Sequence, residues 1–228
     1  MKPDITHATT LQSSLFASAT KPKKSIKHLH NILKPYGLPF QLAASEEMPL
    51  GRERRNTSVI FVSTGCFSLC NAANNLYIAT LFAPTVVGLV DGYSLFHNVN
   101  RRPTHYIHAE THCQGWQVPV DTFAKKCDAF DLWHDIACIL AQRMMIMSMR
   151  ESELVGIDAY GKIRTLLMEL ALYPREIRNQ IKAASFIQRR TRLSRSQTMK
   201  ILAELKKGNF IEINNGILMA INKLPVGF

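Results

Sequence analysis

The chain has 228 residues, and its 28 Lys and Arg outnumber its 17 Asp and Glu to give a formal net charge of +11. No apolar stretch approaches the roughly 20 residues that span a bilayer, and the start of the chain lacks the apolar segment of a secretory signal, so we expect neither a membrane protein nor an exported one. The five cysteines are scattered and odd in number, which argues against a disulfide framework and favours a cytoplasmic protein with free thiols.

Residues 1–37 are predicted to form a tail and a short helix. The first 24 residues are rich in Ser, Thr and Lys, which is typical of a loose terminus. Ser25 can cap a helix that runs to Leu33, because its hydroxyl can accept a hydrogen bond from an unpaired backbone N–H. Pro35 and Gly37 then end that helix.

Residues 38–120 are predicted to form a domain of short β-strands. Short β-rich runs alternate here with Gly, Pro and Asn, a spacing that is typical of a sandwich or roll. We expect no metal site at His105, His108 and His112, because no set of carboxylates or thiolates accompanies them. The runs lie at 58–69, 76–82, 85–90, 106–109 and 115–120, with a hairpin loop at 71–75.

Residues 121–157 are predicted to be a helical linker, with a first helix that breaks near Asp128 and a long helix over about 130–155. An apolar stripe follows the long helix, and a helix of about 25 residues, roughly 37 Å long, can seldom bury such a stripe within one small chain. We expect a parallel helix from a second copy to cover it; the alternative is that it packs on the β-region of its own chain. The residues assigned to this homodimer contact are Trp133, Ile136, Leu140, Met144, Met147 and Leu154.

Residues 158–228 show the pattern of a DNA-binding winged helix-turn-helix. A helix at 160–172 stops at Pro174, and a short helix around Phe186 leads through the turn 191–193 to a second helix capped by Ser194. Gly208 stands where a helix end favours positive φ. Asn-Gly within 214–216 is the preferred pair for a tight hairpin between two short strands.

Most of the positive charge lies over this segment. Thirteen basic and four acidic residues follow Gly161, an excess of nine, which leaves +2 for the first 161 residues. Such a concentration suits attraction to the phosphates of double-stranded DNA. In the major groove, Arg195 can donate two bonds to guanine, with Ser196, Gln197 and Lys200 beside it. The remaining candidate DNA contacts, to phosphate or through the wing, are Arg189, Thr191, Arg192, Ser194, Lys207, Asn214 and Asn215.

Two other functions stay open for this segment: an adaptor whose winged helix binds a protein, and a nucleoid-type protein that binds DNA without sequence choice. The chain shows no nucleophile–base arrangement and no phosphate-cradling Gly-rich loop, so we predict no enzyme and no cofactor. The cysteine spacing fits neither an iron–sulfur cluster nor zinc. A redox role for one of the thiols stays open.

The order of β-roll, long helix and winged helix resembles the Crp/Fnr superfamily of bacterial regulators over about residues 46–225. The resemblance rests on Gly65 and Gly88 in the roll, on the run at 158–163, and on Leu193-Ser194-Arg195 of the second helix. Within the superfamily the chain is most similar to the enterobacterial subgroup named for inhibition of peroxide resistance. The resemblance implies a dimeric α+β transcription regulator with a cyclic-nucleotide-binding-like roll, RNA polymerase as a candidate partner, and control of oxidant-resistance genes.

The departures from this family are informative. Leu89 follows Gly88, where cyclic-nucleotide-binding members have a Glu that holds the ribose, and Arg102-Pro103-Thr104 stands in the phosphate region, where proline removes a backbone donor. We therefore expect no tight cyclic-nucleotide binding, and the effector is unknown. Ser196 replaces a Glu that reads cytosine, so the preferred operator should differ. Arg192 and Gln188 stand where the family has small residues.

Overall fold

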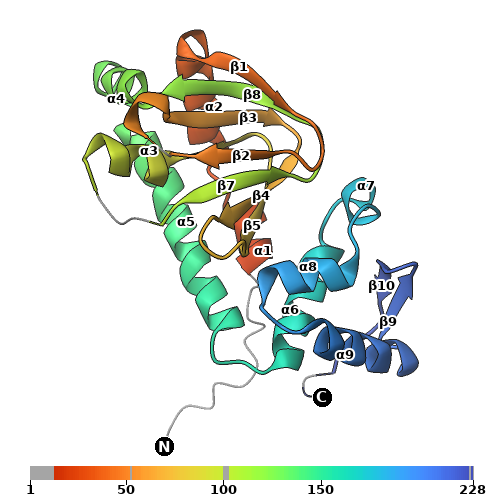
Figure 1. The fold of residues 1–228 in the computed structure, drawn as a ribbon. Helices are drawn as coiled ribbons and strands as arrows, with labels where there is room; N and C mark the ends of the chain where they lie inside the picture. The colour runs from red at the N-terminus through yellow and green to blue at the C-terminus, as the bar shows by residue number, and fades with distance from the viewer. Residues whose placement is uncertain (1–12, 52, 100–102, 226, 228) are drawn as a thin grey trace, which may run out of the picture. The chain divides into compact units, whose positions relative to one another are not determined.

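The computed structural model describes residues 13–51, 53–99, 103–225 and 227 (Figure 1). By its internal contacts the chain divides into two units. One comprises residues 22–140, and the other comprises residues 141–228 together with the segment before residue 22. The first is a β-roll with its covering helices, and the second carries the winged helix-turn-helix. The predicted α+β class and the order of its parts are confirmed.

Two four-stranded antiparallel sheets form the roll. The first has the order β1 (Leu38–Leu42), β8 (Cys113–Pro119), β3 (Ser58–Thr64) and β6 (Thr85–Val87); the second has the order β2 (Glu47–Leu50), β7 (His105–Ala109), β4 (Cys66–Asn71) and β5 (Tyr77–Phe82). Residues of both sheets, such as Ile60 and Ile107, share one buried cluster. The single run predicted at 58–69 is two strands, because the chain turns at Gly65, whose φ is +96°.

Three helices pack against the first sheet: α2 (Lys23–Leu33), α3 (Leu89–Phe96) and α4 (Val120–Ala129). Leu29, Leu89 and Phe123 meet Phe61 in a second buried cluster. The strand predicted at 85–90 ends at Val87, and Gly88 at φ +80° turns the chain into α3, a helix that was not predicted. The capping prediction for Ser25 is also wrong, because the N-cap is Pro22 and Ser25 lies in the first turn. Two 3-10 turns, η1 (Lys34–Tyr36) and η2 (Arg54–Asn56), complete this unit.

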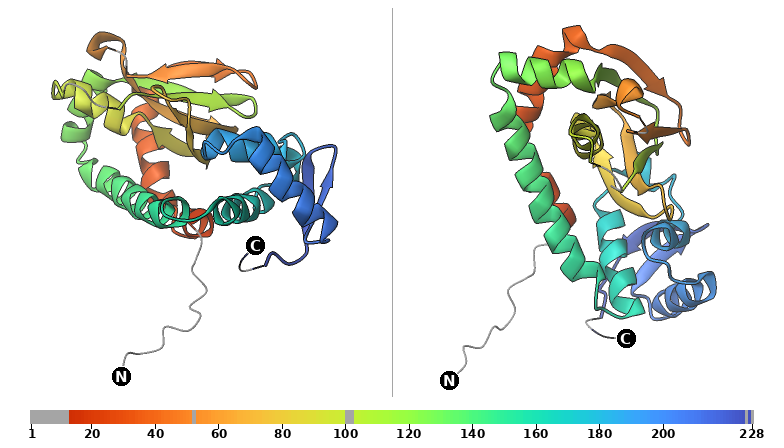
Figure 2. Two further views of the ribbon diagram at one scale, coloured as in Figure 1. Left: turned by 60° about the horizontal axis from the view of Figure 1, so that its bottom comes forward. Right: turned by 60° about the vertical axis from the view of Figure 1, so that its left-hand side comes forward.

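The long helix α5 (Trp133–Leu154) has 22 residues and follows the predicted break after α4. A short helix, α1 (Ser13–Ala19), lies beside its second half (Figure 2). The Ser13 hydroxyl donates to Glu153 at 2.5 Å, and the Gln142 amide donates to the Ala17 carbonyl at 3.1 Å. Residues 13–19 are therefore not the loose tail that was expected, and residues 1–12 lie outside the described part.

The C-terminal segment has the predicted elements α6 (Ala159–Ala171), α8 (Ala183–Arg190), α9 (Arg195–Lys207), β9 (Ile211–Asn214) and β10 (Ile217–Ile221). A further short helix, α7 (Arg175–Arg178), lies between α6 and α8 and was not predicted. Ile163, Ile187, Leu202 and Leu218 are buried and form its core. Within the described residues, no helix is long and apolar enough to cross a membrane.

Candidate nucleic-acid interface

Hydrogen bonds between residues close in sequence hold the turn between α8 and α9. The Ser194 hydroxyl accepts from the backbone N–H of Gln197 at 3.2 Å and so caps α9, as predicted. Arg192 has φ +54°, the left-handed conformation that glycine adopts without strain. This explains why a small residue suits this position, and the Arg192 side chain is left exposed at the turn.

Helix α9 has one buried face and one exposed face. Thr198, Leu202 and Leu205 are buried at helical spacing. Arg195 and Lys200 are exposed. Arg195 lies in the first turn, where its charge adds to the positive end of the helix dipole and attracts anions, and Lys200 lies more than one turn further along. The other predicted residues on the exposed surface of this helix are Ser196, Gln197 and Lys207.

Met199 also lies on this exposed face and was not among the predicted DNA contacts. Its side chain is 47% exposed and lies between Arg195 and Lys200 in the chain. The spacing of four residues from Arg195 was a signal that could have found it, since residues four apart share one face of a helix.

The wing is the β9–β10 hairpin, and its tip is tied to the start of α8. Asn215 and Gly216 have φ of +48° and +81°, as a two-residue hairpin turn with Asn-Gly requires. The Lys182 ammonium donates to the Asn215 carbonyl, and the Ala183 N–H donates to the Gly216 carbonyl at 2.8 Å. The side chains of Asn214 and Asn215 are exposed at this tip.

Two predicted roles change in detail. Thr191 is half-buried, and its hydroxyl donates to the Ile187 carbonyl at 2.9 Å, so it stabilises the turn rather than standing open to a phosphate. Gly208 has φ −78°, and Asn209, at +56°, takes the left-handed conformation instead. Glycine is needed at 208 for space, because a Cβ there would lie 2.4 Å from the Phe210 ring.

A family model described as winged helix-turn-helix DNA binding matches residues 159–226, which run from α6 through the wing. The inhibitor of hydrogen peroxide resistance from Escherichia coli K12 is 31% identical over 208 residues, which cover 91% of this chain and 98% of that protein. The chain belongs to the family of these inhibitors of hydrogen peroxide resistance. The inhibitor of hydrogen peroxide resistance from Salmonella typhimurium is 29% identical over the same length.

Solved structures show that this inhibitor-family chain has the Crp/Fnr fold. CLP, a c-di-GMP-responsive global regulator of Xanthomonas campestris, matches with a TM-score of 0.68 over 88% of this chain and all of that chain. A Crp/Fnr-family regulator from Eubacterium rectale gives 0.67 over 88% of this chain and 89% of the other. Both are 12% identical to this chain, so the likeness concerns the fold alone.

The stripe assigned to dimerisation divides into two halves in this inhibitor-family chain. Ile136 is only 5% exposed and belongs to the roll's buried cluster, with Trp133 and Leu140 packed against that cluster. These three residues therefore contact the roll of their own chain, and Trp133 and Leu140 remain half-buried. Met144 and Met147 are 71% and 64% exposed. Leu154 is half-buried.

In the region where the resemblance to Crp/Fnr regulators places a cyclic nucleotide, this inhibitor-family chain has a carboxylate. Asp91, in the first turn of α3, is buried, and its two oxygens lie 3.0 and 3.1 Å from Nδ1 of His105. Leu89 points into the core cluster, and Arg102 lies outside the described residues. In the described part, no three His, Cys, Asp or Glu side chains form a group that could hold a metal ion.

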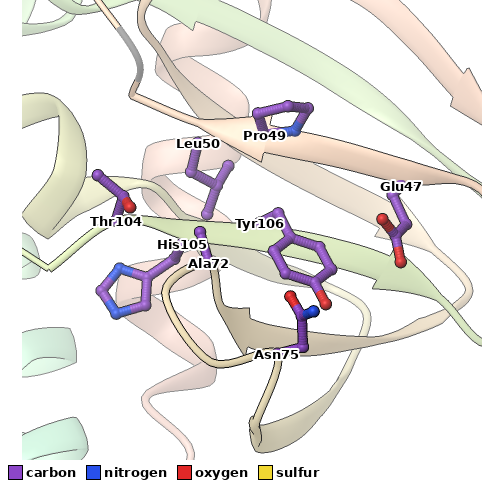
Figure 3. A pocket seen from close by; sticks show the side chains of 8 residues that line it. All are labelled: Glu47, Pro49, Leu50, Ala72, Asn75, Thr104, His105 and Tyr106. Atoms are coloured by element: carbon purple, nitrogen blue, oxygen red, sulfur yellow. The ribbon is translucent and has the colours of Figure 1, made fainter.

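A cavity of about 560 Å³ opens on the roll of this inhibitor-family chain, between β2, β7 and the loop that joins β4 to β5 (Figure 3). Glu47, Asn75 and Tyr106 give it polar walls. Burial, the nearby Cys70 and the Glu47 carboxylate raise the pKa of Tyr106 above its usual value. The other lining residues are Pro49, Leu50, Ala72, Thr104 and His105.

Proposed function

We propose that this protein is a sequence-specific, DNA-binding transcriptional regulator that acts as a homodimer in the cytoplasm. One observation carries the proposal. The first half of α9 presents Arg195, Met199 and Lys200 on one exposed face, and a recognition helix contacts bases in the major groove through residues of this part. The fold and the family are those of regulators, and the function requires no catalytic step.

Base reading would start at the first turn of α9. Arg195 can donate two bonds to the O6 and N7 of guanine, and Lys200 can reach a guanine or the backbone. Ser196 or Gln197 can contact an adjacent base edge or a phosphate. Met199 lies between these polar groups, and its apolar side chain suits the C5-methyl group of a thymine.

Phosphate contacts would hold the helix in register. Arg189 and Arg192 flank the turn, and Lys207 lies at the far end of α9, all of them exposed. Asn214 and Asn215 can touch the backbone from the wing. Ser194 caps the helix through its oxygen and shares a hydrogen bond with the Ser196 hydroxyl at 3.1 Å, so whichever of the two hydroxyls accepts in that bond can donate to a phosphate oxygen. Such contacts position the protein without selecting a sequence.

The dimer would form along the second half of α5. Met144 and Met147 leave an apolar stripe exposed there, and a parallel α5 from a second copy would cover it. A two-fold dimer would place the two α9 helices about 34 Å apart, one turn of DNA, and would bind a palindromic operator.

No cyclic nucleotide is required by this proposal. Leu89 cannot accept from a ribose hydroxyl, and Pro103 lacks a backbone donor in the region where the resemblance places the phosphate. Thiol sensing at Cys127 is also disfavoured, because burial and Asp128 raise its pKa to about 12 and leave little reactive thiolate. The names of the relatives support oxidant-resistance genes as targets. RNA polymerase is the candidate partner at those promoters.

The proposal is tested by selecting binding sites from random duplexes with the purified protein and then measuring affinity against salt. We expect a palindromic consensus, and an affinity that falls by about 10³ to 10⁵ between 50 and 200 mM salt if 6–10 phosphates are neutralised. Equal binding to all sequences would favour a nucleoid-type protein. An absence of salt-dependent DNA binding would favour the adaptor.

A further inference from the structure

A buried ion pair joins the long helix α5 to the winged-helix segment. Arg150, near the C-terminal end of α5, has Nη1 3.0 Å from Oε2 of Glu169 on α6. The side chains are 12% and 7% exposed, so both charges have left water. A pair of this kind differs from a surface ion pair, because breaking it strands one charge in a poorly solvated place.

Glu169 is also held from the DNA-binding side. The Tyr173 hydroxyl donates to its Oε1 at 3.0 Å, and the positive charge of Arg190 acts on the same carboxylate. Arg190 is the last residue of α8, and its guanidinium lies 3.7 Å over the Phe186 ring. The next residue, Thr191, begins the turn into α9. One carboxylate thus connects α5, α6 and the helix that leads to the recognition helix.

The backbone between α5 and α6 does little to fix the angle between these two helices. Four residues, 155–158, separate Leu154 from Ala159. Among them Gly156 has φ +76°, and a Cβ placed there would meet no atom within 4 Å. An open glycine connector permits rotation, so the angle between α5 and the winged helix must be fixed by side-chain contacts across it.

We propose that Arg150 is a positioning residue for DNA binding, which fixes the winged helix on the dimerisation helix through Glu169. In a dimer joined along α5, this contact sets the separation of the two α9 helices, and with it the spacing of half-sites that the protein accepts. The inference rests on the homodimeric function proposed above and assigns Arg150 a role that touches neither DNA nor the partner subunit.

The test compares Arg150→Met with a matched control, Glu151→Gln, which changes an exposed charge on the same helix turn. Each protein is measured on the operator selected by the wild type, on a single half-site, and on operators with one or two base pairs added to or removed from the spacer. Arg150→Met should bind the half-site within about twofold of wild type, lose at least about tenfold on the full operator, and respond less sharply to spacer length. Glu151→Gln should match wild type throughout.

The winged helix should stay folded in Arg150→Met, because Tyr173 and Arg190 still hold Glu169; its thermal transition and its half-site affinity check this. An unchanged spacer preference, or equal losses on half-site and full operator, would overturn the inference and leave the regulator function standing. If the wild-type protein binds paired half-sites no more tightly than a single half-site, both the inference and the proposed homodimeric function are overturned. Should Arg150→Met not fold, Arg150→Gln, which removes the charge but keeps a hydrogen-bond donor, takes its place, and wild-type spacer behaviour in that variant would overturn the inference.

Discussion

The Lys182 ammonium donates to the Asn215 carbonyl at 2.5 Å, so the tip of the wing is tied to the start of α8. The pairing of Lys182 with Ile217 and the bond from the Ala183 N–H to the Gly216 carbonyl lie beside it. The two DNA-facing parts of the segment, the wing and the helix-turn-helix, are therefore connected away from the recognition helix. Lys182, which the sequence analysis counted only among the positive charges, therefore has a structural role.

Lys182→Met should loosen the wing without changing base preference. We expect hydrogen exchange at the Ala183 amide to become about fivefold faster, which corresponds to losing about 1 kcal/mol from one hydrogen bond. Hydrogen-exchange NMR measures this directly. Lys223→Met removes an exposed charge after the hairpin and serves as the control. An Ala183 exchange rate that stays at the wild-type value would show that Lys182 does not hold the wing.

Arg195→Ala and Lys207→Ala should lose affinity in different ways. Arg195 is placed to read a guanine, so its loss should cost about 1–3 kcal/mol on the operator and relax discrimination at one base pair. Lys207 is placed for the backbone, so its loss should weaken all duplexes about equally and reduce the salt slope by about one. Fluorescence anisotropy on operator and random duplexes separates the two. Equal losses on both kinds of DNA for Arg195→Ala would remove its base-reading role.

The contact between Met199 and a thymine methyl can be tested by changing the DNA. Replacing each thymine of the operator in turn with deoxyuridine removes only the C5-methyl group. At the contacted position we expect a loss of about 1 kcal/mol in wild type and almost none in Met199→Ala, because the methyl then has no partner. Met219, which is similarly exposed in the wing, supplies the control variant Met219→Ala. Losses that are the same in wild type and Met199→Ala at every thymine would exclude the contact.

The recognition segment was predictable because its signals are local. Ser194 caps a helix whose apolar residues recur at helical spacing, and Asn215-Gly216 selects one kind of hairpin. Helix α3 was missed because Leu89 and Val90 follow the β-branched residues 85–87 with further apolar side chains, and the positive φ of Gly88 that ends the strand is not visible in the sequence. Helix α1 has no strong signal of its own; its contacts with Gln142 and Glu153, far along the chain, identify it.

The long stripe on α5 shows a different limit of sequence interpretation. Periodicity states that Ile136 and Met147 lie on one apolar face, but it does not state what covers each turn. In the structure, the roll of the same chain covers Ile136 and leaves Met147 exposed. Arg150 was not selected either, because a single arginine in a helix does not reveal a glutamate 19 residues later as its buried partner.

Met147→Glu should prevent dimer formation. A carboxylate on the stripe would face its copy across a two-fold axis, where desolvation and like-charge repulsion both oppose association. Light scattering should then give the mass of one chain, with wild type giving two, and affinity for the full operator should fall to that for a half-site. Met219→Glu is the control, because it places the same charge at an exposed methionine outside α5, and this variant should remain dimeric. A dimeric Met147→Glu would place the interface elsewhere.

Glu169 predicts how stability responds to acid. Burial alone would raise its pKa, but Arg150 and Arg190, with the Tyr173 hydroxyl, outweigh burial and hold the pKa below its ordinary value. A folded-state pKa below the unfolded value of about 4.3 means that the stabilisation is complete above that pH and is lost as pH falls through the folded pKa. Glu169→Gln should therefore be less stable than wild type at pH 7, and the difference should narrow below about pH 4. Thermal melting from pH 3 to pH 7 measures this; a difference that stays constant across the range would mean that ionisation of Glu169 does not stabilise the fold.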